Sequence, residues 1–378
     1  MIYLDYQAST PVAPEAAQAM APWIEERFAN PHSPSRAGRE AAAAIEVARG
    51  QVERTIGATG GKLAFTSGAT EAINWALKGI FERSERRKLV TIATEHAAVL
   101  DTADWLKEQG VEVIRLPVEA NGLVNLALAE AAIDGETALV AAMLVNNEIG
   151  VIQPIADLAR LAHAAGAILL CDAVQALGRV PIPDGPDLIA VSAHKVHGPK
   201  GIGALWMRNG CEPAPLLHGG GQEQGLRSGT SSPALCVGFG AAAALSLARA
   251  DDDAVHVEQL WNAARETLGS DWTINGSTAV RYHGNLNLSR SGLDGARLLS
   301  DCRDIAFSLG SACASGSGRP SHVLRALGLN DRAARSSIRL GFGRYTTLED
   351  MIAACTRLDE AARSQSVLPD RSQSVLPA

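Results

Sequence analysis

A lysine and an aspartate follow two apolar stretches of the sequence, and their types could together hold a cofactor. Asp172 comes just after the apolar run 168–170, and Lys195 comes shortly after the run 188–191. Open α/β sheets bind ligands at the carboxyl ends of their strands. A desolvated lysine forms Schiff bases and a carboxylate pairs with a pyridinium nitrogen, which is the minimal set for pyridoxal phosphate (PLP). A surface lysine and a helix-capping aspartate are the alternatives.

The stretch Thr66–Glu71 joins a predicted strand to a predicted helix and could bind an anion. Free N–H groups at a helix start, hydroxyls and a glycine suit a phosphate. An ordinary N-cap with Glu71 at the third helical position explains the same residues. Ser192 and His194 flank the lysine and could also bond a phosphate. His96 stands at another junction, where an imidazole could stack on a ring, transfer protons or cap the helix.

One cysteine and one arginine in the last third of the chain also have residue types suited to chemistry. Cys313 lies among Gly, Ser and Ala from Leu309 to Gly318, without apolar periodicity. Cysteines are usually buried among apolar residues. Because the sequence around Cys313 has no such apolar pattern, we expect this cysteine to lie in an accessible loop as a reactive thiol. Arg339, in a strand-like segment, has the guanidinium fork that suits a substrate carboxylate. A structural salt bridge is the alternative for this arginine.

Two short motifs are similar to those of hydrolases but lack their companions. Ser192–Lys195 matches the S-x-x-K motif of penicillin-binding proteins, yet S-D-N and K-T-G are missing. His218–Gly221 is similar to the oxyanion loop of lipases, yet the chain has no G-x-S-x-G elbow. We therefore reject both hydrolase interpretations.

Apolar, strand-like runs alternate with helical segments up to about residue 250. Strands are expected at 63–66, 89–94, 111–116, 139–145, 167–171, 188–191 and 202–207. Helices are expected at 14–28, 36–56, 69–82, 97–109, 126–133, 155–165 and 233–249. Because near-continuous apolar strands separated by helices form parallel sheets covered on both faces, the sequence predicts an α/β fold with a mainly parallel seven-stranded sheet.

The acidic triplet Asp251–Asp253 marks a change in composition and a predicted domain boundary. We expect a large domain at 14–250 and a smaller α+β domain made of 1–13 and 251–362. The smaller domain is expected to have helices at 255–268, 295–302 and from 348, with strands near 272–274 and 285–288. Residues 363–378 repeat the sequence Arg-Ser-Gln-Ser-Val-Leu-Pro and are expected to form a disordered tail.

Charge and cysteine content argue against several classes of protein. The 378 residues include 41 acidic and 34 basic side chains, and this formal charge of -7 does not favour a nucleic-acid partner. The N-terminus lacks a signal-peptide pattern, and the longest nearly apolar run, 236–248, is too short to span a bilayer. The six cysteines show no C-x-x-C spacing, so no zinc site or disulfide framework is predicted and a cytoplasmic setting fits.

An ordered set of motifs gives the chain a family resemblance. It contains S-G-A-T-E, E-H-x-x-V, V-N-N-E-I-G, D-A-x-Q, H-K-x-x-G-P-K-G, H-G-G-G, R-S-G-T and G-S-A-C-x-S. Together these resemble the cysteine desulfurases of the NifS/IscS type, class-V aminotransferases among the fold-type I PLP enzymes. The resemblance runs from Tyr3 to about Gly343. It implies conversion of L-cysteine to L-alanine, with the sulfur passing to an enzyme cysteine as a persulfide.

The resemblance also implies a role for each motif residue. Residues expected to contact PLP are Lys195 (covalent bond), Asp172 (pyridine nitrogen), Gln175 (phenolic oxygen), His96 (ring stacking and proton transfer), Asn147, and, for the phosphate, Ala69, Thr70, Ser192, His194 and Thr230 of the partner subunit. Asn147 and Arg339 would orient the substrate, the arginine through the substrate carboxylate. Cys313 would attack the substrate sulfur.

The same resemblance implies a homodimer and a protein that accepts the sulfur, such as an iron–sulfur scaffold protein. No metal site is expected, although the Cys313 persulfide could hand sulfur to an iron–sulfur cluster or ligate one transiently. No nucleic-acid or membrane partner is expected. The C-terminal tail differs from the extension with which housekeeping relatives dock their scaffold, so the acceptor stays open.

Two other functions compete with this interpretation. An aminotransferase or a selenocysteine lyase would use Lys195 without Cys313. A requirement for Cys313 therefore distinguishes a cysteine desulfurase from these two enzymes. A non-catalytic sulfur-assembly protein could keep the fold without binding PLP. A covalent PLP adduct on Lys195 distinguishes that case.

Overall fold

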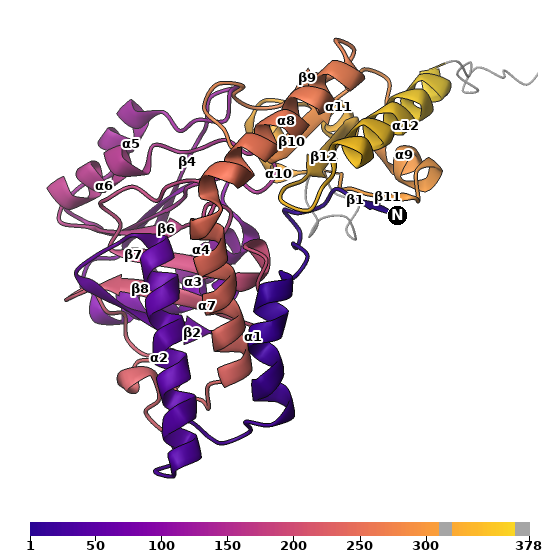
Figure 1. Cartoon of the computed structure of the whole chain (residues 1–378). Helices are drawn as coiled ribbons and strands as arrows, with labels where there is room; N and C mark the ends of the chain where they lie inside the picture. Colours follow the sequence, from indigo (N-terminus) through magenta and orange to yellow (C-terminus); the bar gives the residue numbers. More distant parts are fainter. Residues whose placement is uncertain (310–319, 367–378) are drawn as a thin grey trace, which may run out of the picture.

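Seven strands form one sheet at the centre of the larger part of the chain (Figure 1). The computed structural model describes residues 1–309 and 320–366. In spatial order the strands are β2 (Gly61–Thr66), β8 (Gly203–Arg208), β7 (Leu188–Ser192), β6 (Ile168–Asp172), β5 (Thr137–Met143), β3 (Lys88–Ile92) and β4 (Glu112–Leu116). Every neighbouring pair is parallel except the two pairs that β8 makes, with β2 and with β7. The predicted α/β fold with a mainly parallel seven-stranded sheet is confirmed.

The strand β8 runs against its neighbours because its connection from β7 is short. Parallel neighbours need a crossover of a dozen or more residues, usually a helix. Residues 193–202 hold only the single 3-10 turn η1 (Ala193–Lys195) and a Gly/Pro turn. The start of β8 therefore lies beside the end of β7, with Gly203 paired to Ser192.

Helices cover both faces of this sheet. Alternate residues of one strand separate the faces, since Val140 and Ala142 join one hydrophobic cluster and Leu139 and Ala141 join another. The first cluster includes residues of α2 (Arg36–Ile56), α5 (Leu126–Ala132), α6 (Ile155–Ala164) and α7 (Pro233–Ala248). The second includes residues of α3 (Ala69–Arg83) and α4 (Ala97–Glu108). The helix α1 (Pro14–Glu25) packs on α7, and Figure 1 shows α1, α7 and α2 side by side.

The helix α2 shows how local sequence fixes these elements. Its N-cap Ser35 accepts a hydrogen bond from the Gly38 N–H, and its C-cap Gly57 has a φ of 78°, which glycine adopts readily. Ile45, Val52 and Ile56 are buried on one side of the helix. The helix therefore begins, ends and packs where its sequence predicts.

The remaining elements lie at the top of Figure 1, where most of them pack around a second hydrophobic core, while the two short helices within residues 322–335 pack in a smaller cluster with Ile149 and Val151. They are α8 (Ala250–Leu268), α9 (Gly295–Asp301), α10 (His322–Ala326), α11 (Asp331–Arg335), α12 (Leu348–Ser366), β1 (Ile2–Tyr3), β9 (Thr273–Ile274), β10 (Asn285–Ser289), β11 (Ile305–Ala306) and β12 (Ser337–Gly341). The strand β10 lies between β9 and β12 in an antiparallel sheet, and β1 pairs in parallel with β11. The division into domains at 13/14 and 250/251 stays a prediction.

Three boundaries differ from the sequence prediction by more than two residues. The acidic triplet Asp251–Asp253 lies in the first turn of α8, which begins at Ala250, where negative side chains stabilise a helix N-terminus. A bend of 74° separates α7 from α8, so the change in composition marks a corner between helices. Residues 363–366, expected in the disordered tail, belong to α12, and Arg363 pairs with Asp359 one turn earlier. The first helix ends at Glu25.

The close packing around Gly203, at the start of β8, can be tested by measuring stability. A Cβ on Gly203 would lie 2.6 Å from the Val191 oxygen and 2.7 Å from the Gly68 carbonyl carbon, and backbone atoms cannot rotate away. We expect Gly203→Ala to lower the free energy of unfolding by about 1–3 kcal/mol in urea denaturation. Gly135→Ala is the matched control, because its Cβ would meet nothing within 4 Å. It should change the free energy by less than about 0.5 kcal/mol, and equal losses in both variants would contradict the packing argument.

Candidate active site

The sheet brings most of the predicted site residues to one edge. The strands β2, β3, β5, β6 and β7 all run in the same direction, so their carboxyl ends lie along this edge. The segments that follow them carry the predicted residues: Ala69 and Thr70, His96, Asn147, Asp172, and Ser192 to Lys195. Residues far apart in sequence thus reach one region because the strands are parallel.

Asp172 is the last residue of β6 and is buried, with 5% of its surface exposed. Its Oδ1 accepts one hydrogen bond, from the Val174 N–H at 3.0 Å. Burial raises the pKa of this carboxyl, while that hydrogen bond and the nearby charges of His96 and Lys195 lower it. A buried carboxylate with a single hydrogen-bond donor is a site that a cation would stabilise.

Lys195 ends the turn η1 and is half-buried, so it is no freely exposed surface charge. Its Nζ donates to the carbonyl oxygens of Gln7 and Ala8, the second at 2.8 Å. The Lys195 carbonyl accepts from the Arg179 guanidinium. The amine is therefore held toward a segment at the start of the chain, beside the edge where β6 and β7 end.

His96 is the N-cap of α4, as one of the sequence alternatives proposed. Its Nδ1 accepts the Ala98 N–H at 3.0 Å. In the neutral imidazole this leaves the proton on Nε2. The capping bond fixes the ring orientation and leaves Nε2 as the nitrogen that can exchange a proton. Stacking on a cofactor ring stays a prediction.

Gln175 follows β6 and is buried. Its Nε2 donates to the Gln7 carbonyl at 3.0 Å, and its Oε1 accepts from Arg179 at 3.0 Å. The Gln7 carbonyl thus accepts from both Gln175 and Lys195. One N–H of the Gln175 amide is left over for a ligand.

The predicted phosphate residues come from two segments. Ser67 and Glu71 form a capping contact at the start of α3, in which the Glu71 Oε2 accepts the Ser67 N–H at 2.8 Å. Burial opposes ionisation of Glu71, but hydrogen bonds from Arg227 and Ser67 hold the pKa of Glu71 below its usual range. Ala69 is half-buried and Thr70 is exposed.

Ser192 and His194 form the second of these segments. The Ser192 hydroxyl is buried and makes no hydrogen bond to the described part of the chain. Burial and the charges of Lys195, Lys200 and Arg179 lower the pKa of His194 to about 4. His194 is therefore a neutral donor at neutral pH.

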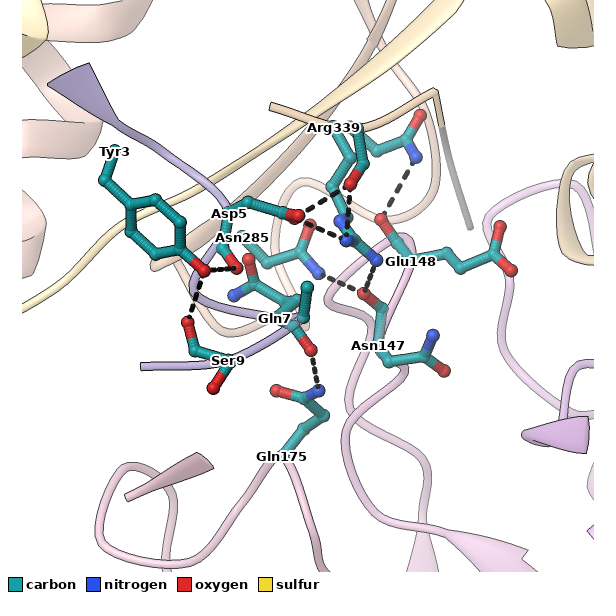
Figure 2. Close-up of polar contacts among 12 residues, drawn as sticks. Tyr3, Asp5, Gln7, Ser9, Asn147, Glu148, Gln175, Asn285 and Arg339 are labelled. Carbon is teal, nitrogen blue, oxygen red and sulfur yellow. Dashed lines mark hydrogen bonds and ion pairs between the residues drawn. The ribbon is translucent and has the colours of Figure 1, made fainter. Parts of the chain in front are cut away.

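Arg339 reaches the same region from β12, and Figure 2 shows its contacts. The guanidinium is 1% exposed and pairs with Asp5 at 2.7 Å. It also donates to the Asn147 carbonyl at 3.1 Å, while the Asn147 side-chain amide bonds no described residue. The Arg339 Nε has no partner among the described residues, although it is buried. The structural salt bridge is present, and the Nε donor has no described partner and could bind a ligand.

Two buried acids were not singled out from the sequence. Glu95 is fully buried, its Oε1 accepts the Met143 N–H at 2.8 Å, and burial raises the pKa of Glu95 well above its usual value. Glu148 is also buried and accepts from the Ser321 hydroxyl, and burial raises its pKa as well. Their positions next to His96 and Asn147 in the motifs were the available signal. Through these hydrogen bonds the two acids hold in place the loops that carry His96 and Asn147.

Two predicted residues are not placed in this region by any described contact. Cys313 lies outside the described residues, so its predicted role stays a prediction. Thr230 is exposed and makes no described contact with Lys195 or Asp172. A contribution of Thr230 to a partner subunit stays a prediction as well.

Two searches of the described residues concern metals and membranes. Residues 1–309 and 320–366 contain no group of three or more His, Cys, Asp or Glu that could hold a metal ion. In the same ranges no single helix is long and apolar enough to cross a membrane, and α7 with α8 meets that criterion only as a bent pair.

The chain is similar over nearly its whole length to proteins of known family. Residues 2–353 match the family described as aminotransferase class-V. The chain is 42% identical over 361 residues to a cysteine desulfurase IscS of Rickettsia bellii, covering 93% of this chain and 88% of that protein. A solved NifS-like protein superposes with a TM-score of 0.87 at 33% identity, covering 95% of this chain and 98% of that one. A structure of SspA in complex with cysteine has a TM-score of 0.82 at 35% identity, covering 92% and 100%.

His197, two residues after the lysine, predicts a dependence of stability on pH. It is buried and has a left-handed φ of 64°, and burial together with the Arg179 charge lowers its pKa to about 4. Below pH 6.5 His197 is protonated in the unfolded chain but stays neutral in the folded chain. The free energy of unfolding therefore decreases as the pH falls toward 4. We expect this histidine to cost about 3 kcal/mol over that window.

The variant His197→Asn isolates this contribution, because asparagine tolerates the left-handed conformation. The free energy of unfolding of both proteins is measured by urea denaturation from pH 7 to 4. The unaltered chain should lose more stability than the variant, by about the amount given above. Parallel pH profiles would show that His197 is not held neutral by the fold.

Proposed function

The chain belongs to the class-V aminotransferase family, a family of PLP enzymes, and is a cysteine desulfurase, and we propose how its own residues carry out that reaction. The observation that carries the proposal is the buried carboxylate of Asp172 at the same sheet edge as the amine of Lys195. A carboxylate and an amine so placed fit the two ends of a PLP ring. The residues around them fit the rest of the cofactor.

The fit extends from the ring to the phosphate. Among the described residues, the Asp172 carboxylate accepts one hydrogen bond and forms no ion pair. A pyridinium nitrogen suits such a carboxylate. The Ser192 hydroxyl and the start of α3 with Ala69 and Thr70 offer donors for a phosphate, and the neutral His194, whose Nδ1 lies 3.4 Å from the Ser9 hydroxyl, could offer its Nε2. Gln175, with one free N–H, would bond the phenolic oxygen.

When bound, PLP withdraws electrons from the substrate carbon atoms and so weakens the bonds at those atoms. Asp172 would keep the pyridine nitrogen protonated, which sustains that withdrawal. His96 would stack on the ring and exchange protons through Nε2, because Nδ1 is committed to the helix cap. Lys195 would bind the cofactor and return a proton to the substrate skeleton.

The substrate carboxylate would bind to Arg339. The free Nε of this buried guanidinium is a donor whose burial without a partner is costly, so an incoming carboxylate oxygen relieves that cost. The Asn147 side-chain amide, with no described partner, would orient the substrate beside it and also touch the cofactor. A charge-assisted hydrogen bond of this kind is stronger than a neutral one.

The sulfur would pass to Cys313. Its thiolate attacks the substrate sulfur, a sulfur–sulfur bond forms, and the carbon–sulfur bond breaks with its electron pair left on the substrate carbon. A proton then converts that carbon skeleton to L-alanine, and the enzyme holds a persulfide. The step needs no external oxidant, because the sulfur is oxidised as the carbon is reduced.

The assembly and setting also belong to this proposal. We infer a homodimer, in which Thr230 reaches the phosphate of the partner subunit, and a protein acceptor for the persulfide such as an iron–sulfur scaffold. The five described cysteines are free thiols, which suits a reducing, cytoplasmic setting. Capture of the persulfide-labelled protein with candidate carriers identifies the acceptor.

The nucleophile assignment predicts a separation of cofactor binding from sulfur transfer. Cys313→Ala should lower the rate of sulfide release from L-cysteine in the presence of a reductant by about 10³-fold or more, because a covalent nucleophile is lost. The visible absorption of bound PLP should persist. Cys211→Ala is the matched control, since Cys211 is a half-buried free thiol elsewhere in the chain. Undiminished sulfide release by the Cys313 variant would remove the nucleophile assignment and favour an aminotransferase or selenocysteine lyase.

A further inference from the structure

The guanidinium of Arg339 is held in a closed triangle with two side chains. Its Nη2 lies 2.7 Å from the Asp5 Oδ1 and 3.1 Å from the Ser308 Oγ (Figure 2 shows the pair with Asp5). The Ser308 hydroxyl in turn donates to the same Asp5 oxygen at 2.9 Å. Each of the three side chains thus contacts the other two, which limits rotation of the guanidinium.

The main chain of Asp5 is fixed by the strand that carries Arg339. Gly341 of β12 donates its N–H to the Leu4 carbonyl at 2.8 Å, and its carbonyl accepts from Tyr6 at 3.1 Å. The Asp5 carbonyl accepts the Ala8 N–H at 2.9 Å. Because the backbone on both sides of Asp5 is bonded, little conformational freedom is lost when its carboxylate meets Arg339.

The contacts leave a defined part of the guanidinium open. Two of its five N–H groups, both on Nη2, bond Asp5 and Ser308, and one on Nη1 bonds the Asn147 carbonyl. The remaining donors are Nε and one N–H of Nη1, and the buried Nε has no partner in the described ranges. Buried donors are nearly always satisfied, so an unpaired one points to a ligand.

We propose that Asp5 is a positioning residue that aims the guanidinium of Arg339 so that Nε faces the carboxylate of the amino-acid substrate. This inference rests on the proposed role of Arg339. The fixed backbone of Asp5 and its second bond to Ser308 favour a permanent support over a competitor that leaves when substrate binds. Loss of Asp5 should therefore weaken recognition of the carboxylate.

The same short segment relates the carboxylate site to the amine. Two and three residues after Asp5, the Gln7 and Ala8 carbonyls accept from the Lys195 Nζ. The Gln7 side chain packs against Gly341, where any Cβ would collide with its Oε1. Asp5 thus belongs to a segment that sets both ends of a bound amino acid, its carboxylate and its amino group.

The test compares two amines that differ only in the carboxylate, L-alanine and ethylamine. Their equilibrium dissociation constants are measured on the PLP-loaded enzyme through the change in visible absorption. The ratio of ethylamine to L-alanine constants reports carboxylate recognition alone. We expect Asp5→Asn to lower this ratio by about tenfold, the loss for one well-oriented hydrogen bond. Ser308→Ala should lower it in the same direction, and it answers the question if the Asp5 variant does not fold.

Two further variants separate the possible outcomes. Arg339→Gln should lower the ratio more than either variant above. Asp359→Asn is the matched control, because it removes a buried carboxylate from Arg290 in the same part of the chain and should leave the ratio unchanged. An unchanged or higher ratio in the Asp5 and Ser308 variants, with a lower one for Arg339→Gln, overturns the positioning role. An unchanged ratio in Arg339→Gln overturns the carboxylate role of Arg339 and this inference with it.

Discussion

A buried carboxylate without a bonded cation is the constraint on which the site depends. Asp172 lies at the end of β6 and accepts one hydrogen bond from the described residues, and burial raises its pKa. Folding tolerates such a group when a nearby charge compensates it, and Lys195 acts in that sense. The parallel sheet makes this arrangement possible, since it delivers the ends of neighbouring strands to one edge. In the proposed function, a cationic ring between Asp172 and the amine would complete the compensation.

The second dependence is on the start of the chain. Residues 2–8 pair with β11 and β12, and carbonyl groups of this segment accept hydrogen bonds from Lys195 and Gln175. This segment therefore connects the smaller core, which supplies Arg339, with the edge of the large sheet. An amino acid bound between Arg339 and Lys195 would contact both the smaller core and the large sheet. The relative position of these two parts therefore sets the geometry of the substrate site. The Asp5–Arg339 ion pair, with an N···O distance of 2.7 Å, is one charged contact across that connection.

The apolar runs made the sheet and its helices predictable, because strand ends follow directly from where a run stops. The positions of Lys195 and Asp172 at the ends of strands were predictable for the same reason. The direction of β8, the 74° bend before α8 and the pairing of Asp5 with Arg339 were not, because each depends on contacts between distant residues or on the length of a turn. The capping role of His96 was one of several alternatives until its Nδ1 bond to the Ala98 N–H was seen.

Reduction with borohydride followed by peptide mapping tests the central claim most directly. The reagent converts a lysine-bound cofactor to a stable pyridoxyl adduct, so the label reports which amine lies opposite Asp172. The account predicts a single labelled peptide containing Lys195. A chain that takes up no label after incubation with PLP, or one labelled at a different lysine such as Lys200, would contradict it.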